Sequence, residues 1–137
     1  MVSKSKQILH VLKYSLTLFF VTRIFLTCIG VYSRSYGMVM LSEYQQIRFF
    51  EYGIQWLSVW GMWDTHWYLD IAKNGYSSYP NTVIGSGLQA NYGFFPLYPA
   101  LIKLLSYVTQ DFYLSGFLIS NICLIASSVV LYKIAEI

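Results

Sequence analysis

The sequence has little charge, little cysteine and little proline. Only 11% of its 137 residues are charged, whereas an ordinary globular protein carries about 25%, so the chain has too few charges to cover a water-exposed surface. The 9 Lys and Arg residues give a net charge of only +3, and they form no basic stripe for a nucleic acid to bind. The two cysteines, Cys28 and Cys123, lie inside apolar runs and are more typical of small buried side chains than of a disulfide or a metal pair. These shortages favour a membrane protein over a soluble domain.

Hydrophobic residues make up 56% of the chain, and the mean hydropathy is +0.49. The clearest apolar segment is 112–132, which contains no charge and is bounded by Asp111 and Lys133. At 1.5 Å per residue it is long enough to cross a bilayer core of about 30 Å. Its small and polar residues, such as Ser120 and Asn121, favour packing inside a helix bundle over contact with lipid on all sides. The segment is therefore predicted to be a transmembrane helix.

A second predicted span covers residues 11–32 and contains Arg23 near its middle. An arginine at that depth costs about 2.5–3.5 kcal/mol on insertion scales. We therefore expect Arg23 to face a protein interior or a watery cavity and to have an anionic partner. The alternative is that Arg23 only tunes packing or extends its head group toward the interface.

A third segment, 94–110, contains Pro96, Pro99 and Lys103 and is either a short span or an interfacial helix. Lysines near the start of the chain place the N-terminus in the cytoplasm, so residues 33–93 form a large non-cytoplasmic loop. The C-terminus is cytoplasmic if segment 94–110 lies in the interface. The predicted fold is an all-α membrane protein, a single domain over 1–137 with two to three transmembrane helices and a helix-containing loop.

The loop contains a stretch with several polar and aromatic side chains, from Trp60 to Tyr76. No helix breaker occurs between Asp64 and Lys73, and Asn74-Gly75 is a stop signal, so we expect a short helix near the membrane surface. Asp64 shares a face with Trp67, Tyr68 and Ile71. Desolvation against aromatic rings raises the pKa of a carboxylate and suits a general base, whereas a helix N-terminus acts in the opposite direction. The alternative role for Asp64 is a helix N-cap.

The other aspartate of this helix, Asp70, is about 120° away from Asp64 around the helix axis. It shares its face with His66, Lys73 and Asn74, which indicates a solvated, charge-paired surface. A metal site built on Asp64, His66 and Asp70 is disfavoured because residues at i and i+2 point to different sides of a helix. We therefore predict no cofactor, and the spacing does not support a divalent cation.

Two further features lie where the loop meets segment 94–110. Pro96 and Pro99 predict a rigid corner where the chain enters that segment. Residues 79–87 are typical of a flexible loop, which is more consistent with a plain connector than with a gate over a substrate.

Two motifs resemble a known family. The pattern Trp63-Asp64-x-x-Trp67-Tyr68-x-x-Ile71-Ala72-x-x-Gly75-Tyr76, followed by Phe94-Phe95-Pro96-Leu97-Tyr98-Pro99, resembles the first lumenal or periplasmic loop of the mannosyltransferase family that includes the second mannosyltransferase of GPI-anchor synthesis and its bacterial relatives. These enzymes belong to the GT-C superfamily. Members are much longer, so the resemblance implies an N-terminal portion of such an enzyme, with the remaining spans as a partner.

The resemblance implies transfer of a hexose from a polyprenyl-phosphate sugar to a hydroxyl acceptor, with inversion, on the non-cytoplasmic face. By this likeness Asp64 would be the catalytic base, and Phe95, Pro96 and Tyr98 would hold the loop against the bilayer. The residues that it assigns to substrate binding are Trp63, Trp67, Tyr68, Tyr76, Phe95, Tyr98 and Arg23.

A hypothesis of another class is a small non-catalytic membrane protein whose aromatic loop binds lipid or a partner subunit. In that case Asp64 would serve only as a helix cap, and Trp67 would contribute to assembly. A cysteine at Ser78 that reacts with an impermeant reagent from the non-cytoplasmic side would support the predicted topology.

Overall fold

The computed structural model describes residues 4–37, 50–77 and 90–135. Over these ranges the regular structure is entirely helical, with five α-helices and one short 3-10 helix, so the predicted all-α class is confirmed at this level. The proposed labelling position, Ser78, and the connector at 79–87 lie outside the described residues.

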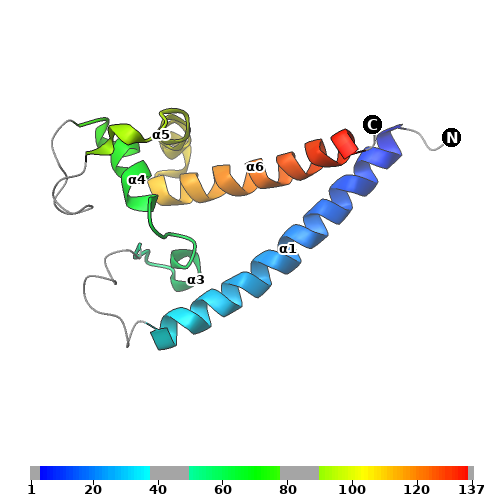
Figure 1. Cartoon of the computed structure of the whole chain (residues 1–137), viewed down its shortest axis with the longest axis horizontal. Coiled ribbons are helices and arrows are strands. Elements are labelled where there is room, and N and C mark those ends of the chain that lie inside the picture. Colours follow the sequence, from blue (N-terminus) through cyan, green and yellow to red (C-terminus); the bar gives the residue numbers. More distant parts are fainter. Residues whose placement is uncertain (1–3, 38–49, 78–89, 136–137) are drawn as a thin grey trace.

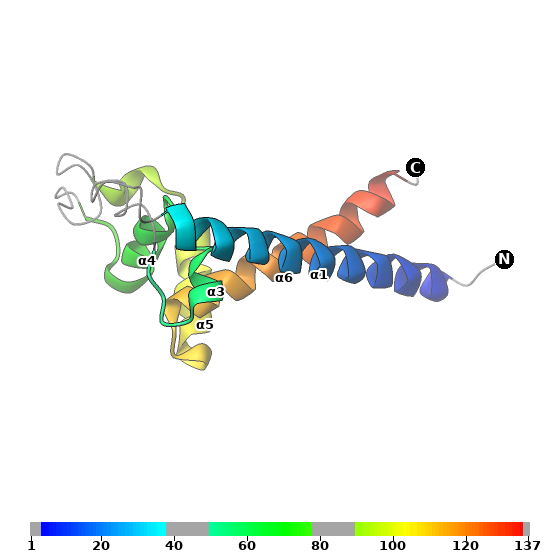
Figure 2. The same ribbon diagram turned by 90° about the horizontal axis from the view of Figure 1, so that it is seen from below.

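Two long helices form the arms of a V (Figure 1). The first is α1 (Lys4–Gly37) and the second is α6 (Phe112–Ala135). Among the described residues these are the two helices long and apolar enough to cross a membrane. They run in opposite directions, so the two termini lie at the same end of the molecule, while the short helices gather at the other end (Figures 1 and 2).

The short elements between the arms are α3 (Gln55–Ser58), α4 (Thr65–Asn74), the 3-10 helix η2 (Asn91–Gly93) and α5 (Leu97–Thr109). Helix α4 matches the helix expected over 64–73 with a shift of one residue. Its stop is at Gly75, whose φ of 84° lies in a region that favours glycine, and whose N–H donates to the Ile71 carbonyl. The sequence signal for this helix end was therefore sound.

Helix α5 is short because of its flanking residues. Pro96 occupies the N-cap position and Pro99 lies in the first turn, where a missing N–H is tolerated. The helix ends at Gln110, which adopts a left-handed φ of 58°. Its 13 residues give a length of about 20 Å, well below a bilayer core of about 30 Å. In Figures 1 and 2 its axis runs across that of α6.

The turn between α5 and α6 is held by Asp111. Its Oδ1 accepts a hydrogen bond of 2.8 Å from the Leu114 N–H, which caps the first turn of α6. Beyond this turn the two helices approach closely at Gly116, where a Cβ would lie 3.1 Å from the Tyr98 hydroxyl and 3.2 Å from Ile102 Cδ1. The small residue therefore allows α5 to pack against α6, and Ile102 is almost fully buried there.

Aromatic rings join the segment that carries α3 to the start of α6. The ring of Tyr113 stacks on Phe50 with a centroid distance of 4.6 Å, and its hydroxyl donates to the Leu57 carbonyl at 2.6 Å. This contact fixes the segment that carries α3 against the first turn of α6. The chain between α3 and α4 consequently lies at the wide end of the V, between the two arms (Figure 1).

Candidate functional site

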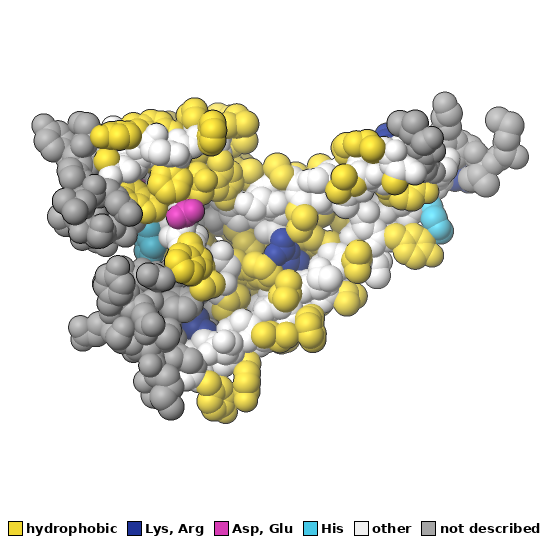
Figure 3. All heavy atoms as spheres, viewed as in Figure 1, with side chains coloured by type: hydrophobic (Ala, Val, Ile, Leu, Met, Phe, Trp, Pro, Cys, Tyr) yellow, Lys and Arg dark blue, Asp and Glu magenta, His cyan; other side chains and the backbone are white. Residues whose placement is uncertain are grey.

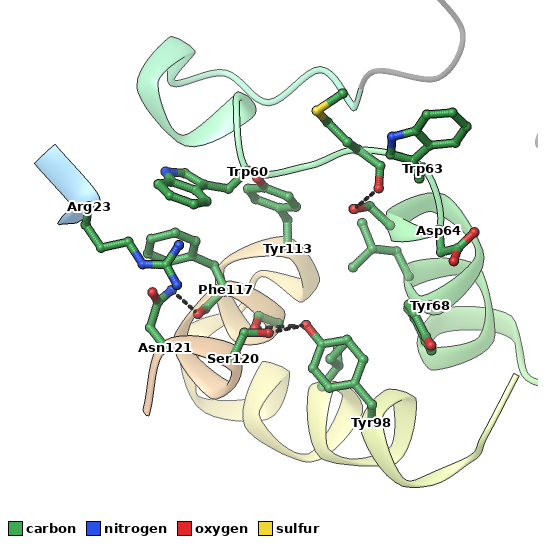
Figure 4. Close-up of a pocket in the computed structure, with 15 residues that line it drawn as sticks. Arg23, Trp60, Trp63, Asp64, Tyr68, Tyr98, Tyr113, Phe117, Ser120 and Asn121 are labelled. Atoms are coloured by element: carbon green, nitrogen blue, oxygen red, sulfur yellow. Dashed lines mark hydrogen bonds between the residues drawn. The ribbon is translucent and has the colours of Figure 1, made fainter. Parts of the chain in front are cut away.

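A cavity of about 340 Å³ lies between α1, the segment before α4, α5 and α6 (Figure 4). Figure 3 shows the molecule hollowed between the two arms, with a basic side chain inside the hollow and an acidic one near its wide end. The residues that line the cavity are Arg23, Trp60, Met62, Trp63, Asp64, Thr65, Tyr68, Leu69, Tyr98, Ile102, Tyr113, Gly116, Phe117, Ser120 and Asn121.

Asp64 lies at the start of α4, at one end of this cavity. It occupies the N-cap position, but its side chain makes no capping hydrogen bond, and its own φ and ψ are helical. The N-cap role is therefore not adopted. Asp64 is also exposed, so the expected burial of its carboxylate against aromatic rings is wrong. The carboxylate is left available to a ligand, between Trp63 and Tyr68 (Figure 4).

The backbone before Asp64 is unusual. Trp63 has a φ of 53°, a left-handed conformation that side chains other than glycine, asparagine and aspartate rarely adopt. The chain turns sharply at this point, and both Trp63 and Asp64 are among the residues that line the cavity. Such conformations cost free energy and persist where the surrounding structure holds them.

Arg23 enters the cavity from α1, on the side opposite Asp64 (Figure 4). Its guanidinium carbon lies 4.2 Å from the centroid of the Trp60 ring and 5.4 Å from that of Phe19. A cation over an aromatic face at this distance is attracted by the ring quadrupole. The Trp60 indole N–H in turn donates to Thr27 Oγ1 at 3.2 Å, which ties the ring back to α1. The expectation that Arg23 faces a cavity is confirmed.

The expected anionic partner of Arg23 is not found among the described residues, where no ion pair forms with it. Its neighbour from α6 is Asn121 (Figure 4), whose amide nitrogen donates to the Phe117 carbonyl at 2.6 Å. The other amide atom, Asn121 Oδ1, is buried and has no hydrogen-bond partner in the described part of the chain. Aromatic and amide groups thus surround the guanidinium in place of a carboxylate.

Tyr98 forms the wall contributed by α5. Its hydroxyl donates to the Gly116 carbonyl at 3.0 Å and accepts a hydrogen bond of 2.8 Å from the Ser120 hydroxyl. Tyr68 packs edge-on against the Tyr98 ring at 5.1 Å. These contacts join α4, α5 and α6 around the cavity.

Comparison with protein-family models, curated proteins and solved structures finds no match. The family resemblance described above therefore rests on the two motifs alone.

Five of the eight residues that the sequence proposed for the site line the cavity, and three do not. Trp67 is only 7% exposed and packs against Phe94 at 5.9 Å. The hydroxyl of Tyr76 donates to the Phe94 carbonyl at 2.7 Å. Phe95 is 85% exposed. Trp67 and Tyr76 thus hold the loop together, and Phe95 belongs to an outer surface.

Several cavity residues were not proposed from the sequence. Trp60 precedes the motif by only three positions, and its place beside Arg23 depends on how α1 packs. Asn121 and Ser120 were assigned to helix packing, and the structure places both at the cavity wall. A polar residue inside an apolar helix was the one available signal for them.

The opposite face of α4 differs from its predicted form. Asp70 was expected to be charge-paired, but its two oxygens accept hydrogen bonds from the amides of Asn74 and Asn91, at 2.8 and 3.1 Å. Asn91 is almost fully buried, and its side chain also bonds the backbone at Gly75 and Ser77. Asp70 therefore anchors the loop around η2.

This face also borders a second, wider cavity of about 490 Å³, lined in part by His66, Asp70 and Asp111. The hydroxyl of Tyr52 donates to Asp111 Oδ2 at 2.7 Å. This hydrogen bond, with lesser contributions from burial and from the charge of Asp111, raises the pKa of Tyr52 above its usual 10.0. No group of three His, Cys, Asp or Glu side chains that could hold a metal ion occurs in the described part of the chain.

Proposed function

We propose that this chain forms the acceptor-activating part of a membrane glycosyltransferase of the mannosyltransferase type. The reaction is transfer of a hexose from a polyprenyl-phosphate sugar to a hydroxyl acceptor with inversion. One observation carries the proposal: a single cavity has an uncapped carboxylate, Asp64, at one end and an arginine without a carboxylate partner among the described residues, Arg23, at the other. The first group suits a hydroxyl acceptor, and the second suits an anionic leaving group.

In this reaction Asp64 takes the proton from the acceptor hydroxyl as that oxygen attacks the anomeric carbon. The bond between this carbon and the phosphate oxygen breaks on the opposite side of the sugar, and the polyprenyl phosphate leaves with the electron pair. The planar guanidinium of Arg23 can form two parallel hydrogen bonds to a phosphate. A cation held in surroundings of low polarity stabilises the charge that develops on the leaving group more strongly than water would.

The membrane placement follows from charge and helix length. Lys6 and Lys13 lie in the early turns of α1, and Lys133 lies in the last turn of α6. Because the two arms are antiparallel, these lysines gather at one end of the molecule (Figure 1). Positive charge marks the cytoplasmic side, so α1 and α6 cross the bilayer and the end with α4 lies on the non-cytoplasmic side.

Asp64→Asn tests the assignment, because the amide keeps the shape of the side chain but cannot accept the proton. Sugar transfer is measured in membranes of cells expressing the complete gene, with a radiolabelled polyprenyl-phosphate hexose as donor. We expect the rate to fall by about 10²- to 10⁴-fold, the range for loss of a general base. The matched control is Glu51→Gln, since Glu51 is exposed and does not line the cavity; it should leave the rate unchanged. Equal rates for Asp64→Asn and the unaltered protein would refute the role of Asp64.

The hypothesis of a non-catalytic binding protein made Trp67 a contact residue. Trp67 is buried against Phe94, so its ring is not available to a partner. We expect Trp67→Ala to act on the stability of the loop, since removing a buried tryptophan costs about 3–5 kcal/mol.

A further inference from the structure

Asn121 carries a buried polar atom that the proposed reaction does not use. The residue lies in the third turn of α6 and lines the cavity. Its side-chain nitrogen donates to the Phe117 carbonyl at 2.6 Å. A carbonyl can only accept a hydrogen bond, so this contact fixes the amide with its oxygen pointing the other way. That oxygen, Oδ1, is inaccessible to solvent and has no hydrogen-bond partner over the described ranges. A buried acceptor of this kind is rare and requires an explanation.

The side chain that faces Asn121 across the cavity is Arg23 of α1 (Figure 4). Cation–π contacts to Trp60 and Phe19 hold its guanidinium. Such contacts require no hydrogen bond, and in the part of the chain that the structure describes the guanidinium N–H groups make none. Because water does not reach Asn121 Oδ1, a donor for this atom has to come from a neighbouring side chain. Arg23 brings such donors from the facing helix.

We propose that Asn121 is a positioning residue for Arg23, and that its Oδ1 accepts a hydrogen bond from the guanidinium when Arg23 binds the leaving phosphate. The inference rests on the role of Arg23 in the proposed function. A phosphate takes two parallel N–H donors of a guanidinium, and the donors on the other edges remain for the amide oxygen. With Trp60 beside it and Asn121 at its edge, the guanidinium is oriented toward the phosphate before the bond to the sugar breaks.

An amide oxygen suits this role better than a carboxylate. An arginine inside a span is expected to have an anionic partner, but a carboxylate at position 121 would neutralise the guanidinium and compete with the phosphate for its donors. The amide of Asn121 accepts a hydrogen bond without carrying a charge. The positive charge of Arg23 therefore stays available to an anionic ligand while the orientation of the side chain is fixed.

Binding of farnesyl phosphate, a short polyprenyl phosphate, tests the inference in the full chain purified in detergent micelles. The affinity is measured by titration calorimetry, with farnesol as the uncharged probe that reports partition into the micelle. Asn121→Leu replaces the amide by an apolar side chain of similar size, and it is combined with Arg23→Met in a double-mutant cycle. The matched control is Ser128→Ala. It removes another hydrogen bond from a side chain to the backbone of α6, of 2.8 Å or less like that of Asn121, since Ser128 Oγ donates to the Ile125 carbonyl at 2.7 Å, and Ser128 does not line the cavity.

We expect Asn121→Leu to weaken binding of farnesyl phosphate about tenfold, the effect of one hydrogen bond to a charged group, and to have no effect in the Arg23→Met background. Ser128→Ala should bind as the unaltered protein does, and farnesol should not distinguish the variants. Equal weakening in both backgrounds would show that Asn121 acts on helix packing and would overturn the inference. Full affinity of Asn121→Leu beside weak binding by Arg23→Met would also overturn it but leave the proposed function standing. Full affinity of Arg23→Met would refute the proposed role of Arg23, and the inference with it.

Asn121→Asp is a second variant, which keeps the shape of the side chain. We expect it to bind farnesyl phosphate more weakly than Asn121→Leu, because its carboxylate neutralises the guanidinium of Arg23. If the amide only filled space in α6, the variant of the same shape would instead bind better than the leucine variant, and that order of affinities would contradict the inference. Helix content measured by circular dichroism verifies that each variant is folded.

Discussion

The hydroxyl of Tyr113 provides a quantitative test of how strongly the segment that carries α3 is held to α6. It donates to the Leu57 carbonyl at 2.6 Å, and both residues are buried. Replacing Tyr113 by phenylalanine removes this bond but keeps the ring and its stacking on Phe50. The Leu57 carbonyl also accepts a hydrogen bond of 3.1 Å from the backbone N–H of Trp60, so the variant does not leave this carbonyl without a partner.

The expected loss is therefore that of one hydrogen bond, about 1 kcal/mol, and not the larger cost of an unsatisfied buried group. At 1.4 kcal/mol per factor of ten, this is about a fivefold decrease in the equilibrium constant for folding. The assay is reversible unfolding in mixed micelles with increasing dodecyl sulfate, followed by circular dichroism. Tyr107→Phe is the control, because Tyr107 is exposed and its hydroxyl has no partner over the ranges that the structure describes; its stability should not change. Equal stabilities for the two variants would refute the role of Tyr113.

Three further predictions follow from the described contacts. Gly61→Ala should destabilise the fold by about 1–3 kcal/mol, because a Cβ there would lie 2.7 Å from the Cβ of Phe50. Gly53→Ala is the control in the same unfolding assay; a Cβ there would have nothing within 4 Å, so the stability should not change. The hydrogen bond to Asp111 raises the pKa of Tyr52. The contribution of Tyr52 to stability should therefore be complete below pH 10 and disappear as the pH rises through the raised pKa. The difference in unfolding free energy between the protein and Tyr52→Phe, measured across this range, should decrease with rising pH. Arg23→Met should improve membrane insertion of α1 by about 2.5–3.5 kcal/mol while lowering sugar transfer, and a variant that inserts better but transfers sugar normally would contradict the assignment of Arg23.

The elements that could be predicted from the sequence are those set by local patterns. The apolar runs at 11–32 and 112–132 lie within α1 and α6, and the helix expected over 64–73 corresponds to α4. Each depends on signals contained within a few turns: an uncharged run, a missing helix breaker, or a glycine stop. The capping role of Asp64 at the start of α4 could not be predicted in this way, since a capping residue is recognised only by the hydrogen bond that it makes.

The surroundings of the site residues could not be predicted in the same way. Arg23 faces Trp60, a residue 37 positions away, because the chain folds back along α1 after its end. The motif predicted Trp67 and Tyr76 as site residues. Both instead contact Phe94, which lies 18 positions after Tyr76 in the sequence. Helix periodicity gives the face on which a side chain lies, but only the tertiary arrangement determines what that face meets.

In the proposed membrane placement, the unequal lengths of the two arms have a consequence for the surrounding bilayer. Helix α1 has 34 residues and α6 has 24, or about 51 and 36 Å of helix. A helix longer than the local hydrocarbon thickness accommodates by tilting, and the longer arm has more excess length to accommodate. Because the arms diverge toward the cavity, the tilt of α1 sets the width of that opening. A thinner bilayer should spread the arms further apart and a thicker one should draw them together, so the thickness of the host membrane would tune access to the space between Arg23 and Asp64.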